Sequence, residues 1–377
     1  MIEMTKLNKI LFILLLVLSF SSCKKEKQSN WTLQVTKLKF GYAQTAKLTL
    51  SNAISSYTLF DQKVTLFNSV MSDWALNNCR TEWQNAYNNY LLLGGFQYCD
   101  EYCTANFNSN QQYIDFSPIN YSFVDYTAIN PNSGIINNAG AYPTLGTGEL
   151  LNLHQLGDEK NATVGFHVME FLFWGEDQSL TTTNSRSANE FLSTSTITAR
   201  RKSFLISSTN ATKQKLNALS FGTTFENDLN ALSPKSTLDL IIGGLTKYIS
   251  EDIINHTIQQ PLNSQSHLDE LSDFSDLTLT HLIQKMKAVK IIWDGRNLFN
   301  DPDNTNYFLV DFAGELAPES RDKINSSLKT IDNLLNSISM NFENAIVSNS
   351  ERAKLTKVIN ELTLVISELN SIKEMVD

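Results

Sequence analysis

The chain has 377 residues and a formal net charge of −9 at pH 7. This acidic balance argues against nucleic acid as a partner, because nucleic-acid binders usually carry a basic patch. The length suits two domains of about 150 residues each. Proline is scarce (7 residues), glycine is modest (15 residues) and no strong strand alternation appears, so the sequence predicts long helices and an all-α fold.

The N-terminus has the pattern of an export signal. Two lysines precede an unbroken apolar run at 10–18, which is shorter than the about 20 residues that span a bilayer. Small residues then precede Cys23, as in bacterial lipoprotein signals. We therefore predict a signal peptide at 1–22, a lipid on Cys23 that anchors the protein in the membrane, and a polar tether at 23–35. The alternative is an ordinary signal peptide with an incidental cysteine.

The first half of the mature chain divides into three parts. Apolar positions recur at helical spacing from residue 40 to residue 90. Residues 104–148 are rich in Asn, Ser, Tyr and Gly and predict a long irregular segment. A short apolar helix is expected at about 163–174. The polar stretch at 176–190 predicts a boundary between a domain at 36–188 and a domain at 189–377.

The second half is again helical in pattern. One predicted helix begins at Ser236 and is expected to end near Ile258, because Pro261 follows. The helix at 276–293 has the clearest apolar stripe. The remaining helices are predicted at 190–209, 211–231, 320–346 and 350–376.

One histidine and one carboxylate stand inside the apolar run between Gly165 and Gly175. His167 and Glu170 are three residues apart and therefore share a helix face. An imidazole and a carboxylate together suit zinc, iron or manganese, and paired Glu and His side chains at this spacing hold metals in helical bundles. The structural alternative is a core histidine bonded to Glu170 or to a backbone carbonyl, and spacing alone favours it.

A second polar cluster lies at 270–278, where three carboxylates and three hydroxyls precede a helix. Oxygen-rich clusters bind hard cations. The alternative is a helix N-terminus, in which Ser275 or Asp276 caps and the acids favour the helix dipole. In that alternative Asp273 is solvated. We also expect His154 and His267 to be exposed, and we find no nucleophile elbow, phosphate-binding glycine loop or His-Glu-x-x-His motif.

Several motifs together resemble the imelysin family. The central one is Gly165-x-His167-x-x-Glu170 followed by Phe-Leu-Phe-Trp-Gly. The supporting stretches, in the family's order, are Arg80-x-x-Trp83, Ile114-Asp115-x-x-Pro118, Glu270-x-Ser272-x-x-Ser275 and Trp293-Asp294-Gly295. The chain departs from the pattern at Ser117, where the family has tryptophan, and at His281, where many relatives have aspartate.

The resemblance implies two helical-bundle domains with a site at their interface. His167 and Glu170 match the family's proposed metal pair, and Glu270, Ser272 and Ser275 would face them from the second domain. It also implies an exported, lipid-anchored protein of Gram-negative bacteria, at the outer membrane and facing the periplasm or the cell surface, with a role in iron uptake. Our leading hypothesis is binding of a divalent metal, iron or zinc, without turnover. The alternatives are a metal-dependent peptidase of the imelysin type and a non-catalytic protein that binds a peptide or a haem-like ligand.

Overall fold

The computed structural model describes residues 3–178, 183–298 and 306–376, and within these ranges it contains helices and no strand. The predicted all-α class is confirmed. None of the described helices combines the length and the apolar character that crossing a membrane requires.

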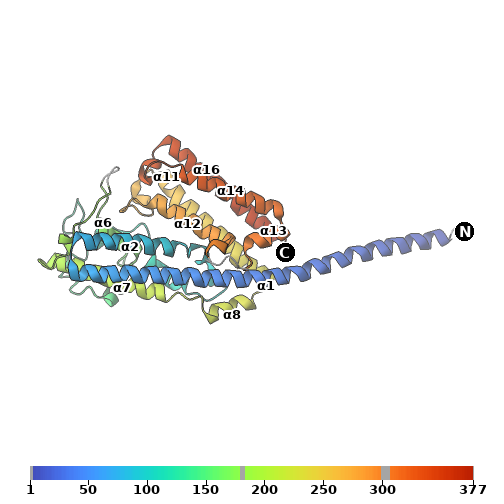
Figure 1. Cartoon of the computed structure of the whole chain (residues 1–377), viewed down its shortest axis with the longest axis horizontal. Helices are drawn as coiled ribbons and strands as arrows, with labels where there is room; N and C mark the ends of the chain where they lie inside the picture. Colours follow the sequence, from blue (N-terminus) through green and yellow to red (C-terminus); the bar gives the residue numbers. More distant parts are fainter. Residues whose placement is uncertain (1–2, 179–182, 299–305, 377) are drawn as a thin grey trace.

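Two long helices form an antiparallel pair (Figure 1). They are α1 (Glu3–Val70) and α2 (Asp73–Leu91), joined by a short turn. Ser72 caps α2 by accepting a hydrogen bond from the backbone N–H of Ala75. The predicted helical stretch from 40 to 90 is confirmed, with this turn as its only break.

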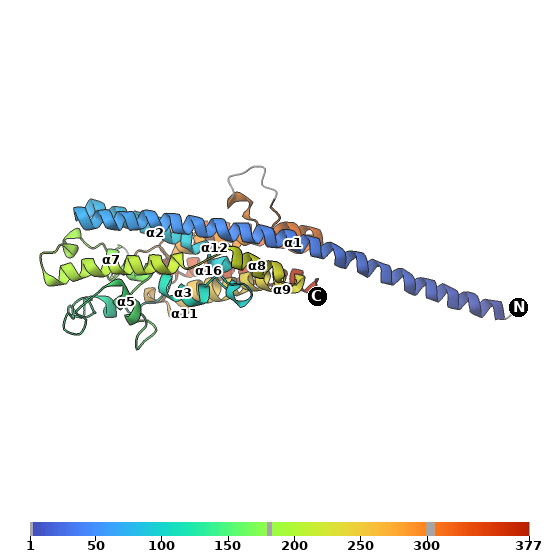
Figure 2. The ribbon, with the colours of Figure 1, turned by 90° about the horizontal axis from the view of Figure 1, so that it is seen from below.

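The first part of α1 projects beyond the other helices (Figures 1 and 2). It covers the ranges expected as signal peptide and tether. The side chains of residues 1–30, Cys23 among them, lie outside the described part of the structure. The signal peptide, the tether and the lipid on Cys23 therefore stay predictions.

The helix that follows the predicted domain boundary packs on the first half of the chain. α7 (Thr196–Asn217) contacts α1, α3, α5 and α6. Its start is fixed by Ser195, whose side chain accepts from the N–H of Thr198 while the Thr198 hydroxyl bonds back to the N–H of Ser195. The predicted break between helices at 190–209 and 211–231 is wrong, because α7 runs through it and ends at Asn217. The division of the chain into two domains stays a prediction.

The segment between α2 and the central motif is largely irregular, as predicted. Its longer helices, α3 (Phe107–Ile114) and α5 (Thr147–Leu153), pack against α7. The shorter helical turns are η1 (Gly94–Phe96), η2 (Cys99–Glu101) and α4 (Tyr121–Val124), with η3 (Ala188–Phe191) just before α7.

The central motif forms a short helix, α6 (Phe166–Trp174), in which every side chain is buried. It packs between α2 and α7. Gly165 and Gly175 flank it with φ angles of 107° and 87°, a region that favours glycine. The two glycines thus let the chain turn sharply into and out of a helix that is enclosed on all sides.

A nearly continuous helical rod follows α8 (Thr223–Ala231). It consists of α9 (Pro234–Leu238), η4 (Asp239–Gly243), α10 (Gly244–Lys247), η5 (Tyr248–Gln259) and α11 (Gln260–Ser264). The predicted end near Ile258 is wrong. The η5 turns are π-helical, with the N–H of Gln260 bonded to the carbonyl of Asn255. Pro261 follows directly after these wider turns, which have already interrupted the regular α-helical hydrogen-bond pattern, and the rod continues through it to Ser264.

The last helices form the other side of the molecule (Figure 1). α12 (Thr278–Trp293) contacts both α2 and α14, so it lies between these two helices. α14 (Pro318–Asn336) packs along α16 (Asn349–Glu374). The predicted helix at 320–346 is shorter than expected, because the N–H of Ser337 bonds back to three carbonyls and closes it. The remaining elements are η6 (His267–Asp269), η7 (Gly295–Leu298), α13 (Leu309–Leu316) and α15 (Phe342–Ala345).

Candidate metal and ligand site

His167 on α6 is buried between two carboxylates. Its Nδ1 lies 2.8 Å from Glu170 Oε2, and its Nε2 lies 3.1 Å from Asp115 Oδ1. The Tyr87 hydroxyl is 3.0 Å from the same Nε2 and donates to Asp115 over 2.9 Å. Both ring nitrogens of His167 therefore have protein partners.

The charges around His167 favour its protonated form. Burial by itself lowers the pKa of His167. The hydrogen bonds and charges of Asp115 and Glu170 outweigh this effect and raise the pKa to about 9. For Asp115, burial raises the pKa, but the bond to His167 and its charge bring it below the usual value. These shifts favour an imidazolium at His167 whose two ring nitrogens are bonded to Asp115 and to Glu170.

Glu170 connects the two halves of the chain. Its Oε1 accepts from the backbone N–H of Ser275 over 3.0 Å and from the Ser275 hydroxyl over 2.6 Å. Since Oε2 is bonded to His167, both oxygens of this fully buried carboxylate are engaged. The structure thus places Ser275 directly against the central motif.

Ser272 makes a separate buried pair. Its hydroxyl lies 2.6 Å from His281 Nδ1, and its backbone N–H donates to the Thr278 hydroxyl. Burial, followed by the positive charge of His167, lowers the pKa of His281 to about 3, so this imidazole is neutral. His281 packs edge-on against Tyr87, which places the pair behind the His167 network.

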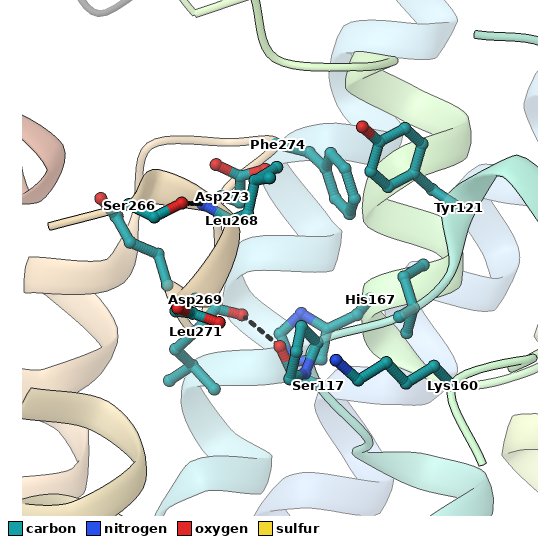
Figure 3. Close-up of a pocket in the computed structure, with 13 residues that line it drawn as sticks. Ser117, Tyr121, Lys160, His167, Ser266, Leu268, Asp269, Leu271, Asp273 and Phe274 are labelled. Carbon is teal, nitrogen blue, oxygen red and sulfur yellow. Dashed lines mark hydrogen bonds between the residues drawn. The ribbon is translucent and has the colours of Figure 1, made fainter. Parts of the chain in front are cut away.

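A cavity of about 330 Å³ opens beside His167 (Figure 3). The segment 266–274 lines one side, and residues Ser117, Tyr121, Lys160 and His167 lie on the other. The Ser117 hydroxyl donates to the Leu271 carbonyl across this seam. The acidic members of the lining are Asp269, Glu270 and Asp273.

Glu270 is an unusual member of that lining. It is 4% exposed, and its Oε1 is buried with no hydrogen-bond partner in the described structure. Burial raises the pKa of Glu270 to about 9, although a hydrogen bond to Thr278 opposes the rise. An unsatisfied buried oxygen in a cavity wall is costly to the folded protein. A ligand in the cavity that supplied a hydrogen-bond donor or a cation to this oxygen would remove that cost.

Further acids and a histidine gather at the end of α6. Asp177, His267 and Asp273 each bring a ligand atom within 4.8 Å of the other two. Asp177 also meets Asp276 and Glu343 in a second group of the same kind. Burial raises the pKa of Asp273 to about 6, and burial with nearby acids raises that of Glu343 to about 7.

A sequence-family model named Imelysin matches residues 51–369. The chain belongs to the imelysin family. Among solved structures, it is similar to the crystal structure of a protein named as an iron-regulated protein A precursor, from Parabacteroides distasonis ATCC 8503. The TM-score is 0.70 at 11% identity, over 91% of this chain and 95% of that one, so the likeness concerns the fold. No curated protein matches the chain.

The imelysin motif residues fall into two sets in the structure. His167 and Glu270 line the cavity, whereas the described lining does not include Glu170, Ser272 or Ser275. Glu170 and Ser275 bond to each other, and Ser272 pairs with His281. The motifs therefore meet, as the family resemblance implied, but only one residue of each, His167 and Glu270, lines the cavity.

Some sequence expectations around the imelysin site are wrong. Asp273 is not solvated, because its side chain is 11% exposed and accepts from His267 over 2.6 Å. His154 is buried and bonds to the Gln112 carbonyl. His267 is half-buried. Polar neighbours in the sequence suggested exposure, but tertiary packing covers all three side chains.

Two members of these acidic groups, Asp177 and Glu343, were not predicted from the sequence as site residues. Asp177 stands two residues beyond Gly175, and extending the central motif by one turn would have included it. Glu343 lies on α15, in a segment without a motif, and nothing local in the sequence signals its role. Only the packing of α15 near the 267–276 segment brings it to the cluster.

Proposed function

We propose that this imelysin-family protein binds a divalent metal ion, iron or zinc, at the bacterial cell envelope and does not turn over a substrate. A lipid on Cys23 would hold it in the outer membrane, facing the periplasm or the cell surface. The observation that supports metal binding is the convergence of an imidazole and several carboxyl groups from distant segments, namely the α6 end, 267–276 and α15. One member of this group, Asp273, also lines the cavity. Such mixed nitrogen and oxygen donors suit zinc, iron and manganese.

His167 and Glu170, the family's motif pair, are poorly arranged to bind a metal. His167 uses both ring nitrogens and Glu170 uses both oxygens in bonds within the protein. A metal at this pair would have to break several buried hydrogen bonds. The carboxyl groups of Glu270 and Asp273, which line the cavity, are better placed to take a cation.

The same contacts favour binding over hydrolysis. A metallopeptidase needs a base beside the metal-bound water. Glu170, the acid of the central motif, instead holds His167 and Ser275. The name of the structurally similar iron-regulated protein A is consistent with iron as the cargo.

We further propose that residues 36–188 and 189–377 form two helical domains, and that the cavity is the site at their interface. Because α7 packs on α1, we assign α7 to the first domain, which would move the boundary to a point after this helix. The contact of α12 with both α2 and α14 supports a broad interface.

Equilibrium titration of the purified protein with Zn²⁺ and with Fe²⁺ under anaerobic conditions tests this function. We expect saturable binding of either ion, reversed by a chelator. An absence of binding for both ions would exclude the proposed function, whichever residues are the ligands.

A further inference from the structure

We infer that the metal ligands of this protein are Asp177, His267 and Asp273, and that the His167–Glu170 pair is a structural connection beside them. The inference rests on the proposed function and names its site. The three ligands come from the chain just after α6, from η6 and from the loop before α12.

The geometry of these three side chains is close to that of a metal site. His267 Nδ1 lies 2.6 Å from Asp273 Oδ1 and 3.8 Å from Asp177 Oδ2. Ligand bonds of about 2.0–2.2 Å in a tetrahedral site separate neighbouring donor atoms by roughly 3.3–3.6 Å. A shift of less than about 1 Å would bring each of these two pairs of atoms to the separation that a bound ion needs.

The local charge favours a cation. Asp276 and Glu343 form the adjoining group around Asp177, so the two groups together contain four carboxyl groups and one imidazole. In the described part of the chain, no lysine or arginine forms an ion pair with Asp273, Asp276 or Glu343. Buried carboxyl groups that lack a lysine or arginine partner are costly to ionise, and a bound metal removes that cost.

Glu270 provides a second and independent observation. Its Oε1 is buried without a partner, and Glu270 lines the same cavity as Asp273. The cavity therefore carries both an oxygen that lacks a donor and one of the three inferred ligands. A cation at Asp273, or a water bound to it, would give this oxygen its missing partner.

The donor set also selects the class of ion. One imidazole nitrogen with carboxylate oxygens suits Zn²⁺, Fe²⁺ or Mn²⁺, while the absence of a thiolate disfavours soft ions such as Cu⁺. The three described cysteines outside the N-terminal segment are buried and free, and none belongs to this group.

Zinc affinity of matched variants tests the assignment, measured by competition with a chromophoric chelator. Asp177→Asn and His267→Gln should each weaken Zn²⁺ binding by at least ~10-fold, since loss of even an outer partner of a metal ligand costs about 10–100-fold. Glu170→Gln and the exposed-site control His256→Gln should bind within about twofold of the unmodified protein. Each variant is first checked for its helical circular dichroism and unfolding midpoint.

A mutation-free measurement covers the case in which a variant does not fold. Nitrogen-15 NMR of labelled histidines should show that Zn²⁺ shifts the His267 ring nitrogens and leaves those of His167 in place. If Zn²⁺ instead shifts His167, or if Glu170→Gln abolishes binding while His267→Gln retains it, the assignment is wrong but the metal-binding function stands. If no ion binds the unmodified protein, both fail.

Discussion

His167 shows how a motif residue can be essential for structure at the scale of single side chains. Its imidazolium lies between Asp115 and Glu170, and Glu170 in turn holds Ser275. Three segments that are far apart in sequence thus depend on one buried charge. Removing one member of such a group leaves the others without compensation.

The variant Glu170→Gln should destabilise the protein by about 3 kcal/mol, because it leaves the buried His167 cation with one carboxylate in place of two. Urea unfolding followed by circular dichroism measures the change. The matched control is Glu149→Gln, which alters an exposed acid on α5 and should have almost no effect. Equal stability of the two variants would show that the His167 network contributes little.

His154 predicts a pH dependence of stability. Burial lowers its pKa from 6.5 to about 4, although the bond to the Gln112 carbonyl opposes this shift. Its folded pKa is below the unfolded one, so its contribution is complete above pH 6.5 and is lost as pH falls toward 4. Between pH 7 and pH 5 the free energy of unfolding should fall by about 2 kcal/mol more in the unmodified protein than in His154→Gln. Parallel pH profiles for the two proteins would contradict this account.

At the scale of elements, the central helix depends on its flanking glycines. Gly165 has φ 107° and ψ 169°, a conformation that is essentially confined to glycine. A side chain there would also place its Cβ 3.0 Å from the carbonyl oxygen of Ile114. The turn therefore fixes the direction in which α6 carries His167 toward Asp115.

Gly165→Ala should lower the free energy of unfolding by about 2 kcal/mol, from backbone strain and from the contact with Ile114. The matched control is Gly148→Ala in α5, where an added Cβ meets no atom within 4 Å and alanine favours the helix. The control should be neutral or slightly stabilising. Thermal unfolding of both variants makes the comparison, and a neutral Gly165→Ala would argue against a strained turn.

Sequence periodicity predicted most helices because their apolar faces are buried, as in α12 and α16. It also placed His167 and Glu170 on one helix face, where they do meet. It could not identify their other partners, since Asp115 and Ser275 are 52 and 105 residues away from the residues they contact. The family resemblance predicted that those segments converge. The position of Glu343 in the acidic group could not be predicted, because only tertiary packing brings α15 there.

At the scale of the whole molecule, the cavity and the acidic group lie where the motif helix meets the segment before α12. The long α1 reaches away from this region toward the N-terminus (Figure 2). A lipid at Cys23 would therefore attach the protein at a distance from the proposed metal site.

The variant Cys23→Ser tests that attachment. Without the thiol no lipid can be added, so the protein should move from the membrane fraction to the soluble fraction of the cell envelope. Fractionation followed by immunoblotting measures the distribution, with Cys79→Ser as the control that leaves the N-terminal cysteine intact. Equal membrane association of Cys23→Ser and the unmodified protein would contradict lipid anchoring through this residue.

Elemental analysis of the protein purified without added metal tests the central claim most directly. The carboxylates and imidazole around Asp177 predict iron or zinc in an amount close to one ion per chain. Metal content indistinguishable from that of the buffer, both as purified and after incubation with either ion, would contradict the account.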